Sequence, residues 1–142
     1  MDILNDYRRV DSTALAMVGI VLLCVDMCKS DGDFTENQHE DILDLLAHSE
    51  RDREQIEYLI NKAKSDNQSY KVHANHLYEI LKDHPDLLEM TLASLYKLAL
   101  TDRVLHPEEL KLMLDIMEIF KIKPSRYFLI KQKIYNILGL NL

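Results

Sequence analysis

The stretch SDGDFTENQ, residues 30–38, returns in weaker form as TDRVLHPEE, residues 101–109, 71 positions further along the chain. Each copy follows a run of apolar residues and precedes a segment with apolar residues at helical spacing. The sequence therefore predicts two helix–turn–helix units, roughly residues 12–48 and 85–120, that form an internal pseudo-repeat. The whole chain, residues 1–142, is expected to form a single domain around one core.

The composition of the chain favours helices over sheets and an acidic surface over a basic one. Only 3 glycines and 3 prolines occur in 142 residues, and Leu, Ile, Met, Glu and Lys are abundant. The formal net charge of −7 argues against nucleic acid as a partner, because binding a phosphate backbone requires a basic surface. We expect a cytoplasmic protein, since the first nine residues lack the apolar core of a signal peptide.

Helical periodicity predicts an all-α fold of seven helices without strands. Two of these helices, residues 13–28 and 85–100, are apolar on nearly every face. Such helices need neighbours on all sides, so we expect them as a central pair, antiparallel or crossed, surrounded by amphipathic helices. The amphipathic helices are predicted at about residues 36–46, 50–64, 70–81, 107–120 and 125–138.

The first apolar helix is expected in a protein core rather than in a membrane. It is shorter than the roughly 18 to 20 apolar residues of a membrane span, and Asp26 interrupts its far end. The sequence thus predicts no membrane span, and a peripheral association with membranes is left open. Cys24 and Cys28 lie one helical turn apart and are expected as buried thiols, with a metal or redox pair as the alternative.

The acidic turns do not follow the pattern of a calcium-binding EF-hand. Polar side chains at positions 31, 33, 35 and 37 alternate as calcium ligands do. Position 6 of such a loop would however be Glu36 instead of glycine, and position 12 would be Ile42 instead of the bidentate glutamate. The second turn departs further from the pattern, because Leu105 and Pro107 stand where ligands would be needed.

Each shared element of the two turns has a local structural role. We expect an aspartate to accept backbone hydrogen bonds, an apolar residue to anchor the turn in the core, and a Gln or Glu to reach back to the helix start. The corresponding pairs are Asp31 and Asp102, Phe34 and Leu105, and Gln38 and Glu109. Gly32 is expected in a left-handed conformation, and because Arg103 stands at the equivalent position, the second turn cannot depend on that geometry as cheaply.

The segments CVDMCKSDGDFTENQ and LYKLALTDRVLHPEELKLMLDIMEIFKI resemble the TerB-like domain of tellurite-resistance proteins. They also resemble the related cytoplasmic domain of membrane-anchored DnaJ-like co-chaperones. The resemblance extends over most of residues 13–120. It implies an all-helical fold with an internal repeat, a non-enzymatic role as an interaction module in stress responses, and a divalent cation bound by the acidic turns.

The resemblance places the candidate metal ligands at Asp31 and Asp102, with Glu109 at the second helix start, and the first turn adds Asp33. The chain departs from the family pattern at two positions. Gln38 stands where a glutamate is usual, and the counterpart of Gly32 carries a positive charge. Because hard cations prefer several carboxylate oxygens, each turn alone is an incomplete site. Turn capping without a metal is therefore the competing interpretation.

No pattern in the sequence indicates catalysis. The tripeptide HPD at residues 84–86 matches the signature of J-domains, but here its proline is expected to start a helix. His39 is expected to face water, and His73 and His76 are expected at the surface. No Ser, Cys or Lys lies in a recognisable nucleophile context, so we expect no enzyme.

Two functions follow from these observations. The first is a non-enzymatic protein-interaction module of a stress-response system, related to tellurite resistance or to co-chaperones. Its acidic surface favours a protein partner with a basic surface. The alternative is a divalent metal-ion binding or sensing domain that uses the acidic turns.

Overall fold

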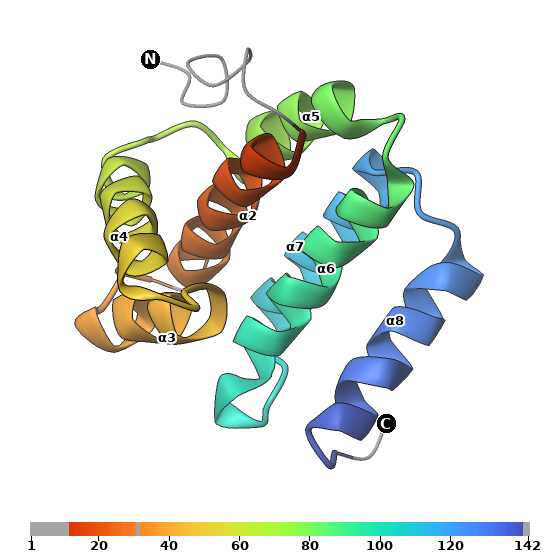
Figure 1. Cartoon of the computed structure of the whole chain (residues 1–142). Helices are drawn as coiled ribbons and strands as arrows, with labels where there is room; N and C mark the ends of the chain where they lie inside the picture. Colours follow the sequence, from red (N-terminus) through yellow and green to blue (C-terminus); the bar gives the residue numbers. More distant parts are fainter. Residues whose placement is uncertain (1–11, 31, 141–142) are drawn as a thin grey trace.

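The computed structural model describes residues 12–30 and 32–140; residues 1–11, 31 and 141–142 lie outside this description (Figure 1). Within the described residues there are seven α-helices, one short 3-10 helix and no strand, so the predicted all-α fold is confirmed. The helices are α2 (Ser12–Lys29), α3 (Glu36–Leu46), α4 (Glu50–Lys64), α5 (Tyr70–Leu81), α6 (Pro85–Ala99), η1 (Leu100–Asp102), α7 (Pro107–Ile119) and α8 (Pro124–Ile137).

The two apolar helices α2 and α6 form the centre of the bundle, as predicted. Helix α2 packs against α4, α5 and α6, and α6 also packs against α7 and α8. Figure 1 shows α2 and α6 side by side and running in the same general direction, so the antiparallel arrangement is wrong. Helices α3, α4 and α5 lie between α2 and α6 in the sequence and bring the chain back to the end of the bundle where α2 begins. Both acidic turns therefore lie at the opposite end, where α2 and α6 finish (Figure 1).

Each of the seven α-helices in the described residues contributes buried side chains to one hydrophobic cluster. The central helices are buried most completely, with Val21 and Leu23 of α2 and Leu92 and Leu95 of α6 each 0% exposed. Both cysteines are buried free thiols, as predicted. No helix within the described part of the chain combines the length and the apolar character that crossing a membrane requires.

Helices α2 and α5 approach each other closely at Gly19. A Cβ atom at this position would lie 2.5 Å from both methyl carbons of Leu77, whose side chain is fully buried. The absence of a side chain at Gly19 therefore permits the contact between these two helices.

The helices that follow the two acidic turns of the pseudo-repeat have the predicted N-terminal caps. Thr35 Oγ1 accepts a hydrogen bond from Gln38 N at 3.2 Å, and Gln38 Oε1 accepts one from Thr35 N at 2.9 Å. At the second turn, Glu109 Oε1 accepts from the backbone amide of His106 at 3.0 Å. Phe34 and Leu105 are partly buried against the core, which confirms their role as anchors.

The backbone conformation at the equivalent positions 32 and 103 differs between the two turns. Gly32 has a φ of 149°, and its counterpart Arg103 takes a left-handed conformation with a φ of 66° and a ψ of 13°. The guanidinium of Arg103 donates to the carbonyl oxygen of Leu138 at 3.3 Å, which ties the second turn to the end of α8. A residue for which this conformation is costly is thus held by a tertiary contact.

Candidate functional site

The second acidic turn holds Asp102 and Glu109 around His106. Asp102 Oδ1 accepts from Val104 N at 3.0 Å, and Oδ2 lies 2.8 Å from His106 Nε2. Partial burial opposes ionisation of Asp102, but the hydrogen bonds from His106 and the Val104 amide outweigh it, and the pKa of Asp102 lies below its ordinary value. The structure therefore brings these two candidate ligands together as parts of a capped turn.

The first acidic turn contributes Asp33, which is exposed and makes no hydrogen bond or ion pair to another described residue. Asp31, the remaining candidate, lies outside the described residues. Among the residues that the structure describes, no group of three or more His, Cys, Asp or Glu side chains is arranged to hold a metal ion. A metal site that joins the two turns thus stays a prediction.

His39 is 5% exposed, so the expectation that it faces water is wrong. It lies three, four and seven positions before Ile42, Leu43 and Leu46, on the same buried face of α3. Its Nε2 is 3.5 Å from Glu57 Oε1, and its ring packs against Phe34 with the centroids 6.2 Å apart. The helical spacing rather than the polarity of the side chain determines its burial.

His73 is also buried, with only 1% of its side chain exposed, so its predicted surface position is wrong. Its Nδ1 donates to Asp26 Oδ2 at 2.5 Å. Its Nε2 lies 3.3 Å from Asp66 Oδ1 as an ion pair without hydrogen-bond geometry. Asp26 belongs to α2, His73 to α5 and Asp66 to the loop between α4 and α5, so the cluster joins three segments of the chain.

The arrangement of the cluster favours a protonated imidazole. Burial alone would lower the pKa of His73, but the hydrogen bond to Asp26 and the charges of Asp26 and Asp66 outweigh it and raise the pKa above its ordinary value. Burial also raises the pKa of Asp26, against the opposing hydrogen bond from His73. Lys29 adds a positive charge, since its Nζ donates to the backbone oxygen of Asp66 at 3.1 Å.

Neighbouring polar groups extend this cluster toward α7. The hydroxyl of Tyr70 donates to Asp115 Oδ2 at 2.5 Å, which connects the start of α5 to α7. A cavity of about 450 Å³ lies beside the cluster and is lined by residues that include Asp26, Lys29, Asp66, Tyr70 and Glu108. Sequence reasoning missed this cluster, although Asp26 is the single charged residue within the apolar run of residues 13–28.

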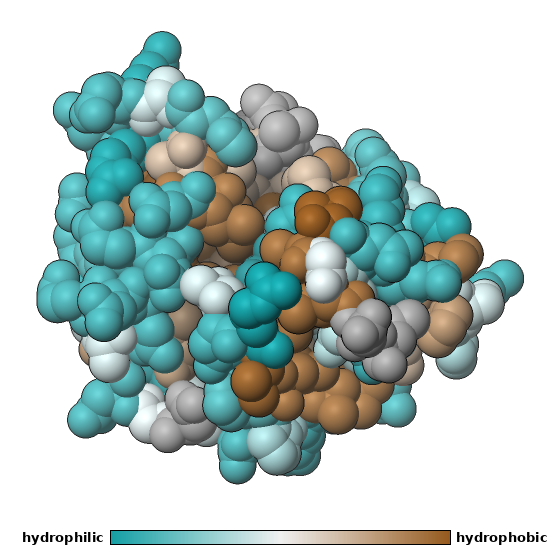
Figure 2. All heavy atoms as spheres, turned by 90° about the horizontal axis from the view of Figure 1, so that it is seen from below, coloured by the Kyte–Doolittle hydropathy of each residue, from teal (hydrophilic) through white to brown (hydrophobic). Residues whose placement is uncertain are grey.

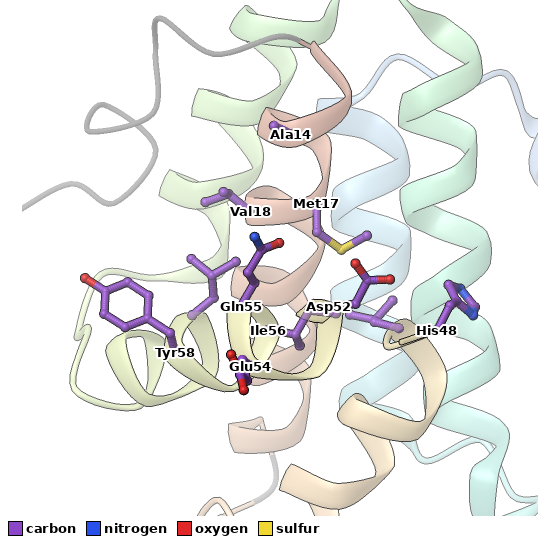
Figure 3. A pocket seen from close by; sticks show the side chains of 11 residues that line it. Ala14, Met17, Val18, His48, Asp52, Glu54, Gln55, Ile56 and Tyr58 are labelled. Atoms are coloured by element: carbon purple, nitrogen blue, oxygen red, sulfur yellow. The ribbon is translucent and has the colours of Figure 1, made fainter. Parts of the chain in front are cut away.

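A separate apolar groove lies between α2 and α4 and has a volume of about 560 Å³. Figure 3 shows Met17 and Val18 of α2 facing Gln55 and Ile56 of α4 across it. The lining is completed by Ala14, Leu46, His48, Asp52, Glu54, Tyr58 and Leu59. The described lining thus contains two carboxylates and neither lysine nor arginine.

The surroundings of the groove are acidic as well. Residues 36–64, which span α3 and α4, carry eight Asp and Glu against four Lys and Arg. Figure 2 looks at the end of the bundle where α2 and α6 finish and shows hydrophilic residues covering the side formed by α3 and α4. Hydrophobic residues gather nearer the middle of the same view.

The fold places the chain among small all-α proteins built around two capped acidic turns. Comparison with known proteins identifies the family within this class. The family model described as tellurite resistance protein TerB matches residues 17–132. The chain belongs to the TerB family. No curated protein and no solved structure matches the chain.

Proposed function

We propose that this TerB-family chain is a non-enzymatic protein-interaction module of a stress-response system. Its partner supplies a segment with apolar residues flanked by basic ones, and this segment binds in the groove between α2 and α4. The observation that carries the proposal is the groove itself, whose apolar floor is bordered by Asp52 and Glu54.

The chemistry of the groove supports a helical segment as the ligand. Amphipathic helices bind in apolar grooves through residues at helical spacing, and buried apolar contacts supply most of the affinity. The carboxylates at the rim favour cations beside those contacts and disfavour acidic segments. A partner with a basic surface therefore fits this site.

The groove can be tested by capturing proteins from a lysate of the source organism at near-physiological salt. The double variant Asp52→Lys, Glu54→Lys reverses the charge at the rim, and Glu118→Lys on the exposed face of α7 serves as the control. We expect the control to retain the proteins that the unmodified chain captures and the rim variant to lose them. Equal capture by both variants would contradict binding in the groove.

Divalent metal binding in the acidic turns is the second candidate. It is favoured by the lowered pKa of Asp102, which keeps this carboxylate ionised, and by the exposed carboxylate of Asp33. Calorimetric titration with calcium, magnesium, zinc and manganese, repeated with Asp102→Asn, tests this function. Heat of binding that disappears in the variant supports the metal site, and the absence of binding below millimolar metal refutes it.

A further inference from the structure

The last part of the chain has a charge opposite to that of the rest. Residues 121–142 contain five Lys and Arg and no Asp or Glu, whereas residues 1–120 contain the other 12 Lys and Arg and all 24 Asp and Glu. The net charge is thus +5 in the last segment and −12 in the remainder. Helix α8, which lies in the basic segment, is the outer helix that packs on α6.

The outward side of α8 carries exposed apolar side chains between cations. Phe128 is 53% exposed and Leu129 is 50% exposed, while Tyr127 and Ile134 point into the core. With 100° of rotation per residue, Gln132 and Asn136 lie on the same outward face of α8 as Phe128 and Leu129. Lys131 lies at one edge of this face and Lys133 at the other. We name the surface formed by Phe128, Leu129, Lys131 and Lys133 the α8 ridge.

We infer that the α8 ridge of one chain binds in the groove between α2 and α4 of a second copy. The inference rests on the proposed function, since it identifies a second copy as a partner of the same groove. The two surfaces are complementary in two ways. The ridge presents the exposed apolar side chains of Phe128 and Leu129 with lysines beside them, and the groove is apolar with Asp52 and Glu54 among its lining residues.

The positions of the two surfaces exclude binding within one chain. Figure 1 places α3 and α4 on one side of the bundle and α8 on the other, with α2 and α6 between them. Pairing two α8 ridges directly would bring like charges together, which is unfavourable. The contact is therefore heterologous, and each bound copy leaves one groove and one ridge free for further copies.

A single helix face buries less surface than the roughly 800 Å² per partner of a stable interface, so the association is expected to be weak and dependent on concentration. Because charges border both surfaces, added salt should weaken it further. Sedimentation velocity of the full chain between about 10 µM and about 1 mM, at low and at high salt, measures this behaviour. We expect the sedimentation coefficient to rise with concentration at low salt.

Two variants that each lose one surface test the geometry. The groove variant is Asp52→Lys, Glu54→Lys, and the ridge variant is Phe128→Ser, Leu129→Ser. The ridge residues are exposed, so their replacement should leave the fold intact, as circular dichroism and the melting temperature of each variant verify. We expect each variant alone to remain monomeric at all concentrations.

Mixing the two variants provides the decisive measurement. The intact ridge of the groove variant can bind the intact groove of the ridge variant, so the mixture should form a dimer that does not grow further. Monomeric unmodified chain at all concentrations, or a mixture without dimers, would overturn the inference. The proposed function is judged separately, because the ridge variant retains its groove and should still capture partner proteins from the lysate.

Discussion

Replacing His73 by leucine tests whether the buried Asp26, His73 and Asp66 cluster stabilises the fold. The substitution removes the cation and leaves two carboxylates facing each other, with Asp26 9% and Asp66 6% exposed. Removing one partner of a buried ion pair costs about 3–5 kcal/mol, because the remaining charge is uncompensated. The adjacent cavity of about 450 Å³ gives water access to the carboxylates, so we expect a loss of about 3 kcal/mol.

A loss of this size is a substantial part of the roughly 5–15 kcal/mol by which a domain is stable. Urea denaturation followed by far-ultraviolet circular dichroism at neutral pH measures it for the unmodified chain and for His73→Leu. The matched control is His48→Leu, because His48 is exposed in the loop between α3 and α4. In the double variant Asp26→Leu, His73→Leu one carboxylate is also removed, so the combined loss should be smaller than the sum of the single losses.

The pH dependence of stability gives an independent measurement. The pKa of His73 is raised in the folded state, so its stabilising contribution is fully present below its ordinary pKa of about 6.5 and is lost as the pH rises through the folded pKa. The raised pKa of Asp26 acts in the same direction at lower pH. We expect the unmodified chain to lose stability as the pH rises above about 6.5 and His73→Leu to lack this decline. A loss below about 1 kcal/mol in His73→Leu, with an unchanged pH profile, would refute the reasoning.

Three further predictions concern the backbone and the caps, each measured as the free energy of unfolding in urea. Arg103→Val should cost about 1–2 kcal/mol, because a β-branched residue is disfavoured at a φ of 66° and the contact to Leu138 is lost, whereas Arg103→Gly should stay within about 0.5 kcal/mol of the unmodified chain. Equal effects of the two substitutions would rule out backbone strain as the cause. Gly19→Ala should cost about 1–3 kcal/mol, since its Cβ would lie 2.5 Å from the buried Leu77, and a stabilised variant would show that the two helices separate easily. Thr35→Ala should cost about 1 kcal/mol through the loss of the cap on α3, whereas Thr35→Ser should preserve most of it.

Much of the local structure could be predicted from the sequence because it depends on residues close together in the chain. The cap of α3 involves side chains three positions apart, and Pro85, Pro107 and Pro124 each begin a helix. The two apolar helices were recognisable because residues of nearly every face are hydrophobic. Their parallel direction was not, because it depends on how the three intervening helices return the chain.

The candidate site was predictable only in part. Asp102 and Glu109 were identified through the repeated turn, and the structure places both around His106. The buried cluster was missed, since Asp26 and His73 are 47 positions apart and no local pattern connects them. His39 and His73 were assigned to the surface because polarity was given more weight than helical spacing.

By itself, the sequence determined that the described part of the chain folds as seven α-helices with two copies of one capped turn, since periodicity and capping act within one or two helical turns. It also determined the family, because the repeated turn carries the resemblance. Only the tertiary structure decided which polar residues are buried together and which surfaces remain open. The physical reason is that burial and charge pairing depend on contacts between segments far apart in the chain, as in the contact of α2 with α5 that encloses His73.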